Sequence, residues 1–137
     1  MVTPGVSFND HVLERKHNNF LASIHVNKNV WGISFLDIST AEFYGAQGNQ
    51  QYVGKLVQSL FPAEIIFSKT AREKFEQQFG NDHSTFALDE WVYQFDYAHD
   101  KLIQHFKTAS LKGFGLDGLN EAIIAAGAIL HYLEVTE

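Results

Sequence analysis

The stretch Trp31-Gly-Ile-Ser-Phe-Leu-Asp-Ile-Ser-Thr40 decides the fold of this chain. It combines β-branched and aromatic residues with a single acidic residue, Asp37. That composition predicts a central β-strand, and the similar run Ala41-Glu-Phe-Tyr-Gly45 predicts the next one. A carboxylate near the end of a central strand is also where many metal-dependent nucleases begin their active sites. The role of Asp37, catalytic or structural, is therefore the main question that this stretch poses.

Outward from this stretch, the preceding segment predicts a strand as well. Residues 20–27 alternate, with Phe20, Ala22, Ile24 and Val26 on one face. Turn residues follow at 27–29, so residues 20–27, 31–39 and 41–47 form three consecutive strands with short links. This pattern predicts an antiparallel meander.

Helices and strands alternate in the next part of the chain. Asn49 is placed to cap a helix that Pro62 ends, and the apolar run at 63–68 predicts a buried strand. Because a helix connects that strand to the meander, we expect it to run parallel to its partner. Thr70 and Glu73 have the spacing of a capping box for a helix that runs to Phe79.

The last third predicts one more strand and two helices. Residues 84–88 are a weak strand, and Asp89 is placed to cap a long helix. The apolar stripe of that helix would comprise Trp91, Phe95, Ala98, Leu102 and Phe106. A loop at 111–118 precedes a final helix over 120–133, which is apolar on nearly all sides and so must be covered on more than one side.

The order of elements favours an α/β fold of the ribonuclease H-like type. Its expected form is a mixed five-stranded sheet, made of an antiparallel meander plus parallel crossover strands, with helices on both faces. With 137 residues the chain has the length of one domain. It contains no cysteine, no signal peptide and no run of 18 apolar residues, which favours a cytoplasmic location and excludes a thiolate metal site.

The charge pattern argues against tight binding to nucleic acid by this chain alone. The net charge is −6, from 10 basic and 16 acidic residues, and the basic residues are scattered. Strong binding to nucleic acid requires a concentrated basic surface that displaces counterions. Aromatic residues make up 14% of the chain, and a surplus of aromatic side chains can mark a surface that meets another domain or a partner.

One reading of Asp37 is a magnesium-dependent nuclease. Such an enzyme needs three or four carboxylates around two metal ions, and the candidates beside Asp37 are Glu42, Asp117 and Glu121. Ser68 and Lys69 stand at the end of the fourth strand, where a nuclease of this type would want an acid. The favoured interpretation is that Asp37 binds the backbone of Ser39 and Thr40 in a turn.

Two other motifs carry little chemistry. Gly113-Phe-Gly115-Leu-Asp-Gly118 matches the dinucleotide fingerprint, but it follows a helix, whereas that motif functions only after a strand. The seven histidines include no pair at the helical spacing of a metal site. We therefore expect no cofactor, no metal ion and no catalytic residue in this chain.

Six local strings distributed along the chain form a recognisable set. They are, in order, Val2-Thr-Pro-Gly, Asn19-Phe-Leu-Ala-Ser-Ile, Leu36-Asp-Ile-Ser-Thr-Ala-Glu-Phe, Leu60-Phe-Pro-Ala-Glu-Ile, Leu111-Lys-Gly-Phe-Gly and Ala125-Ala-Gly-Ala-Ile-Leu-His-Tyr-Leu. Together these strings resemble the connector domain, or domain II, of the bacterial MutS family of mismatch-recognition proteins, and the resemblance covers residues 2–136.

The resemblance implies a non-catalytic module of a larger DNA mismatch repair protein. Residues 1–18 would be a linker from a preceding domain, and residues 19–137 a connector domain that relays signals between the mismatch-binding and ATPase parts. ATP, Mg²⁺ and mismatched DNA would be bound by the parent protein, a homodimer.

The partners implied are the neighbouring domains of the parent and MutL. In the family, part of the MutL docking surface lies near the start of the long helix. In this sequence that region carries Tyr97, His99, Asp100 and Lys101. The family often has neutral amides where Asp100 and Lys101 stand here, and a solvated helix face is the competing interpretation of these two residues.

Overall fold

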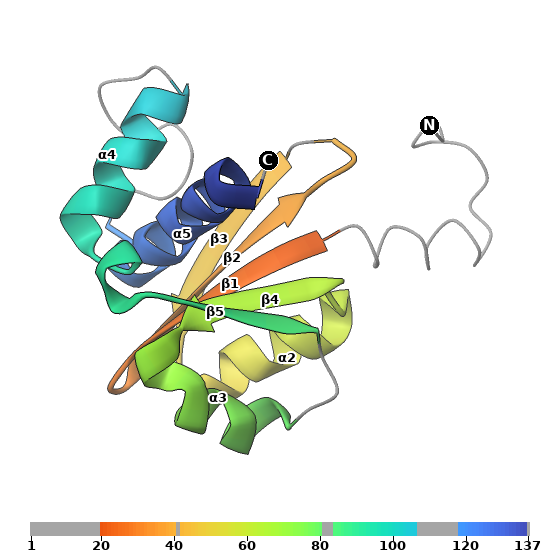
Figure 1. The fold of residues 1–137 in the computed structure, drawn as a ribbon. Helices are drawn as coiled ribbons and strands as arrows, with labels where there is room; N and C mark the ends of the chain where they lie inside the picture. Colours follow the sequence, from red (N-terminus) through yellow and green to blue (C-terminus); the bar gives the residue numbers. More distant parts are fainter. Residues whose placement is uncertain (1–19, 41, 81–83, 107–117, 137) are drawn as a thin grey trace, which may run out of the picture.

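Five strands form one mixed sheet in the order β3-β2-β1-β4-β5 in the computed structural model, which describes residues 20–40, 42–80, 84–106 and 118–136 (Figure 1). The strands are β1 (Phe20–Asn27), β2 (Val30–Asp37), β3 (Glu42–Gly48), β4 (Glu64–Ser68) and β5 (Thr85–Leu88). β1, β2 and β3 are antiparallel neighbours, whereas β4 runs parallel to β1 and β5 runs parallel to β4. The predicted meander, the parallel crossover strand and the mixed five-stranded sheet are confirmed.

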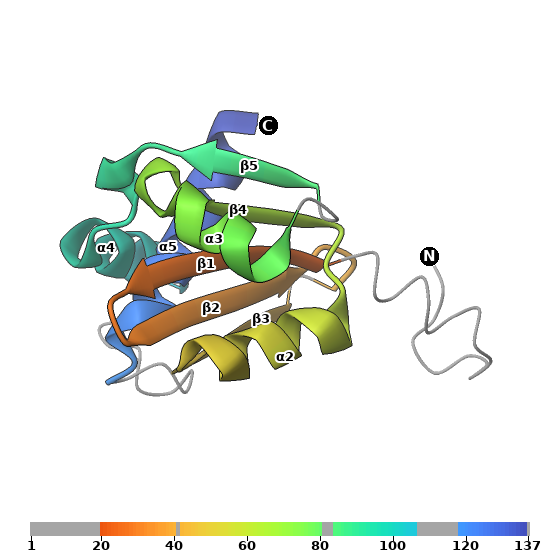
Figure 2. The same cartoon turned by 90° about the horizontal axis from the view of Figure 1, so that it is seen from below.

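Helices cover both faces of the sheet, as predicted. α2 (Gln50–Leu60) and α3 (Arg72–Phe79) lie on one face, and α5 (Asn120–Thr136) lies on the other, with α4 (Phe95–Phe106) packed beside it (Figures 1 and 2). The core under α2 and α3 contains the predicted inward set of β1, with Ala22 and Ile24 fully buried. Both faces of β1 and β2 are covered, so these central strands are apolar on both sides.

α5 is the central helix of the second layer. All nine residues from Ala122 to Leu130 are buried, between the sheet and α4. Close backbone approaches explain this depth. A Cβ at Gly32 of β2 would stand 2.2 Å from the carbonyl carbon of Glu121, and one at Gly127 would stand 2.3 Å from the Cβ of Ala98. The expectation that this helix is covered on more than one side is confirmed.

Two helix ends follow the sequence signals. The side chain of Asn49 accepts a hydrogen bond from the backbone N–H of Tyr52 at 2.8 Å, so Asn49 caps α2. Gly80 ends α3 at a φ of 67°, a conformation that favours glycine. The predicted segment before residue 20 and the glycines at 113 and 115 lie outside the described residues.

The predicted capping box at Thr70 and Glu73 is wrong. Residues Lys69–Ala71 form a 3₁₀ turn, and α3 begins only at Arg72, without a side-chain cap. Ser68 takes the capping role instead, because its hydroxyl accepts from the Thr70 N–H at 3.2 Å and also bonds the Thr70 hydroxyl at 2.8 Å. The Thr70 side chain is therefore committed to the turn.

The prediction that Asp89 caps one long helix is also wrong. Residues Glu90–Val92 form a separate 3₁₀ turn without a side-chain hydrogen bond from Asp89, and α4 begins at Phe95. The chain bends because Tyr93 turns into the sheet, where its hydroxyl lies 3.1 Å from the Ser23 hydroxyl of β1. The bend leaves the Trp91 side chain outside the core, at 53% exposure.

The hydropathy of the helices argues against a membrane span. α5, the most apolar helix, has 17 residues. Within the described part of the chain, no helix has both the length and the apolar character needed to cross a bilayer.

Candidate interaction face

Asp37 is a turn-forming residue, as the favoured interpretation held. It lies at the end of β2 with 6% of its surface exposed. Its Oδ1 accepts hydrogen bonds from the backbone N–H groups of Ser39 at 2.9 Å and Thr40 at 3.4 Å. These bonds end β2 two residues before the predicted limit at Ser39, because they close the turn into β3.

Of the carboxylates named for a nuclease, only Glu42 lies beside Asp37, as its cross-strand partner in the β2–β3 pair. Glu42 is exposed and accepts from the Tyr44 hydroxyl at 2.9 Å, a bond that raises the pKa of Tyr44. Glu121 lies over Gly32, five residues along β2 from Asp37 and so about 16 Å away at the rise of a strand. Asp117 lies outside the described residues. Among the residues that the structure describes, no group of three metal-ligating side chains occurs.

The first of the residues named for docking, Tyr97, is fixed between α4 and α5. Its hydroxyl lies 2.8 Å from Nδ1 of His131. Burial and the nearby charge of Lys101 lower the pKa of His131, whose hydrogen bond with Tyr97 joins α4 to α5. Tyr97 is therefore half-buried and held in place by α5.

Lys101 is one helical turn further along α4 and is equally fixed. Its ammonium group forms an ion pair with Glu134 of α5 and lies 5.5 Å from the centre of the Tyr97 ring. Burial opposes the charged form of Lys101, but Glu134 and Tyr97 outweigh it and raise the pKa of this amine. Lys101 is a structural cation that fastens α4 to α5.

The structure places His99 and Asp100 differently. His99 stacks on Phe95 with ring centroids 5.4 Å apart, on another side of α4. Asp100 is exposed, and no cation among the described residues pairs with it. Of the four residues, Asp100 alone is an exposed charge without an ion-pair partner among the described residues. Its neighbours on α4, Tyr97 and Lys101, are held by contacts with α5.

Trp91 is the functional candidate that the sequence interpretation missed. Its indole packs edge-on against Tyr97 at 5.3 Å and against His131 at 5.2 Å between centroids. We call the surface made of Trp91, Tyr97, Lys101, His131 and Glu134 the Trp91 face. The stripe at 91, 95 and 98 suggested core because it has helical spacing, and only the bend at Tyr93 breaks that spacing.

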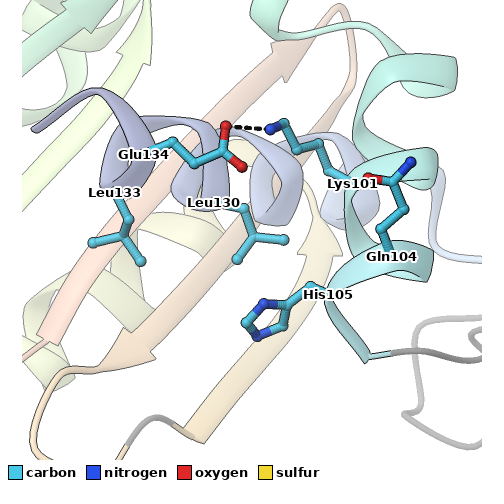
Figure 3. Close-up of a pocket in the computed structure, with 6 residues that line it drawn as sticks. All are labelled: Lys101, Gln104, His105, Leu130, Leu133 and Glu134. Atoms are coloured by element: carbon cyan, nitrogen blue, oxygen red, sulfur yellow. Dashed lines mark hydrogen bonds and ion pairs between the residues drawn. The ribbon is translucent and has the colours of Figure 1, made fainter. Parts of the chain in front are cut away.

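A hollow of about 540 Å³ opens beside the Trp91 face, between α4 and α5 (Figure 3). Leu130 and Leu133 provide its apolar lining, and Gln104 and His105 lie along its α4 side. The Lys101–Glu134 ion pair forms part of its wall. Among the described residues that line the hollow, none is a serine, threonine or tyrosine.

His25 marks the opposite end of α5. Its Nε2 lies 3.3 Å from Oε1 of Glu121, and its ring stacks on Tyr93 at 5.9 Å. Burial lowers the pKa of His25 below its ordinary value of 6.5, and Glu121 offsets only part of this effect. Gln47 of β3 accepts from the N–H groups of Glu121 and Ala122 and so fixes the same helix end.

We expect the free energy of unfolding to fall as the pH is lowered from 7 through 6.5 toward 5.5. The unfolded chain, in which His25 has its ordinary pKa, binds the proton more tightly than the folded chain does. His25→Gln should flatten this dependence, whereas Glu121→Gln should steepen it because Glu121 raises the pKa of His25. Urea unfolding across this pH range measures the slopes, and equal slopes for the two variants would contradict the assignment.

The fold and the site define an α/β domain with a covered central sheet and an aromatic face fixed between two helices, and its described part contains no group of three metal-ligating side chains. Comparison with known proteins is consistent with that class. The family model described as MutS domain II matches residues 19–137. The chain therefore belongs to the MutS domain II family.

Curated relatives match the chain over its full length. It is 55% identical over 137 residues to the DNA mismatch repair protein MutS of Cytophaga hutchinsonii, and 54% identical over 138 aligned positions to that of Flavobacterium johnsoniae. The MutS of Bacteroides fragilis is 52% identical. In each case the match covers 100% of this chain and 16% of the relative, so the chain spans about a sixth of the length of these proteins.

Proposed function

We propose that this chain is a non-catalytic connector domain of a MutS-type mismatch repair protein, and that it offers a docking surface for MutL at the start of α4. The observation that carries the proposal is the exposed Asp100 on α4. The neighbouring Tyr97 and Lys101 are bound to α5, Tyr97 by a hydrogen bond to His131 and Lys101 by an ion pair with Glu134. Binding surfaces function best when rigid elements hold their side chains in place.

The strand order supports a ribonuclease H-like classification. A meander of β1, β2 and β3 followed by parallel β4 and β5 on the other side of β1 is the arrangement expected of that fold. Asp37 and Glu42 are cross-strand partners, but no third metal-ligating side chain joins them among the described residues, which agrees with a domain that has the fold without the nuclease chemistry. ATP, Mg²⁺ and mismatched DNA then belong to other parts of a cytoplasmic, homodimeric parent protein.

α5 supports the proposed relay. Its 17 residues span about 25 Å, and its central part is buried throughout. Contacts with β1 and β3 fix its first turn through His25 and Gln47, and contacts with α4 fix its last turns through His131 and Glu134. A rigid helix fixed at both ends transmits a displacement from one end of the domain to the other.

Charge reversal at Asp100 tests the docking function. We expect Asp100→Lys to weaken binding to the MutL ATPase fragment at least tenfold, because it places a cation where the partner meets an exposed carboxylate. Interferometry at low and physiological salt measures the binding. Asp100 suits this test better than Lys101, since replacing Lys101 also breaks the ion pair with Glu134.

The matched control is Glu73→Lys. Glu73 is exposed on α3, on the other side of the sheet, and its substitution changes the net charge by the same amount. We expect this variant to bind as the unaltered chain does. Equal binding by the Asp100→Lys variant and the unaltered chain would remove the start of α4 from the docking surface.

A further inference from the structure

The segment from Asp89 to Asp100 is acidic and carries no lysine or arginine. It contains Asp89, Glu90, Asp96 and Asp100, all of them exposed. In the described part of the chain, Asp89 alone among them has an ion-pair partner, Lys69 at 3.0 Å, and that pair lies at the surface, where pairing is weak. The carboxylates of this segment are available to a partner.

The basic groups of the Trp91 face are already engaged inside the domain. Lys101 pairs with Glu134, and Nδ1 of His131 is hydrogen-bonded to the Tyr97 hydroxyl. The lysine and the histidine of the Trp91 face therefore do not neutralise the exposed carboxylates of the adjoining segment, Glu90, Asp96 and Asp100. Which charges remain available to a partner is thus decided by contacts that form on folding.

The geometry brings the carboxylates and the indole onto one surface. Residues four apart on a helix share a side, so Asp96 and Asp100 form a stripe on α4 next to the stripe of Tyr97 and Lys101. Trp91 packs on Tyr97 from the turn before α4, and Glu90 precedes it. The indole, 53% exposed and in contact with the rings of Tyr97 and His131, therefore belongs to a segment in which Glu90 directly precedes it and Asp96 directly precedes Tyr97.

We infer that the partner docks on this surface with a basic segment that places an arginine on the Trp91 indole and further cations beside Glu90, Asp96 and Asp100. The inference rests on the proposed docking function and names the chemistry of the partner. A guanidinium group stacks on an indole face and pairs with carboxylates at the same time, which a lysine ammonium does less well. Fixed aromatic side chains with a charged rim are typical of the residues that dominate binding energy.

The test is the salt dependence of binding to the MutL ATPase fragment by this chain and its Glu90→Gln/Asp96→Asn variant. The matched control is Glu73→Gln/Glu76→Gln, which removes two carboxylates from α3. We expect the unaltered chain and the control to bind more weakly as salt rises from 50 to 300 mM. The Glu90→Gln/Asp96→Asn variant, called the acidic-face variant below, should bind about tenfold more weakly at low salt and lose most of the salt dependence.

Substitution of Trp91 tests the stacking separately. Trp91→Phe keeps an aromatic face and should bind within about threefold of the unaltered chain, whereas Trp91→Leu should bind about tenfold more weakly. Thermal unfolding of both variants controls for folding, and an exposed indole predicts only small changes in melting temperature.

The outcomes separate this inference from the function on which it rests. If the unaltered chain binds and neither the acidic-face variant nor Trp91→Leu weakens binding, the basic-segment inference is overturned and the docking function stands. If the unaltered chain shows no saturable binding at any salt concentration, both are overturned. Loss of affinity in both variants, with the α3 control unchanged, supports both.

Discussion

Phe67→Ala is expected to lower the free energy of unfolding by about 3–5 kcal/mol, the usual cost of emptying a buried phenylalanine site. Phe67 lies in the middle of the sheet on β4 and is 1% exposed. Its ring centroid lies 4.3 Å from that of Phe75 on α3, so truncation leaves a cavity between the sheet and that helix. Urea unfolding followed by circular dichroism measures the loss.

Phe86→Ala is the matched control for this prediction. Phe86 lies on the adjacent strand β5 but is 49% exposed, with a ring contact to Tyr132. We expect its truncation to cost about 1 kcal/mol or less, because surface substitutions remove little buried area. Similar losses for the two phenylalanines would contradict the described packing of β4 and α3.

Gly127→Ala is expected to destabilise the domain by about 2 kcal/mol, although alanine favours a helix over glycine by about 1 kcal/mol. The added Cβ would stand 2.3 Å from the Cβ and 2.4 Å from the Cα of Ala98. Ala98 lies on the buried side of α4, and its Cα and Cβ cannot rotate out of the way as a long side chain could. The whole of α4 must therefore move away from α5. That movement also separates Tyr97 from His131, and we expect docking to weaken with it.

Gly54→Ala provides the control, because it has the same substitution in another helix. A Cβ at Gly54 of α2 would stand 2.7 Å from the amide nitrogen and 3.8 Å from Cδ of Gln78, both at the far end of a flexible side chain. We expect this variant to be stabilised by about 0.5–1 kcal/mol, because the Gln78 side chain can move aside and the helix propensity improves. If Gly127→Ala proves as stable as Gly54→Ala, the close approach of α4 and α5 is wrong.

The sheet and the last helix could be predicted from the sequence because their signals are local. Alternation in residues 20–27 defines β1, the turn residues after it define the meander, and an all-apolar segment defines α5. The role of Asp37 was also predictable, since an aspartate that binds the backbone two and three residues ahead is a local motif.

The turns before α3 and α4 could not be predicted, because distant contacts decide them. Tyr93 breaks the expected long helix by reaching Ser23, 70 residues away in the chain. Helical spacing of Trp91 and Phe95 pointed to the core, but spacing along a chain has meaning only while the helix continues. The burial of Tyr93 against the sheet therefore outweighs the helix propensity of residues 90–94.

For the proposed docking site, the sequence could name residues of α4 but not their partners. The resemblance to the MutS family indicated Tyr97, His99, Asp100 and Lys101, but the partners of these residues come from α5. The Tyr97–His131 bond joins residues 34 apart in the chain, and the Lys101–Glu134 pair joins residues 33 apart. No local pattern reveals which charges such contacts leave available.

The most direct test of the central claim is the mutation rate of cells whose MutS carries this chain in place of its own domain II. The MutS of Cytophaga hutchinsonii, 55% identical over this chain, is a suitable host protein. We predict that the hybrid restores a low mutation rate, that the hybrid with Glu73→Lys does so too, and that the hybrid with Asp100→Lys leaves the rate as high as in cells without MutS. Full repair by the Asp100→Lys hybrid would contradict a docking role for the start of α4, and failure of the unaltered hybrid would contradict a connector function for this chain.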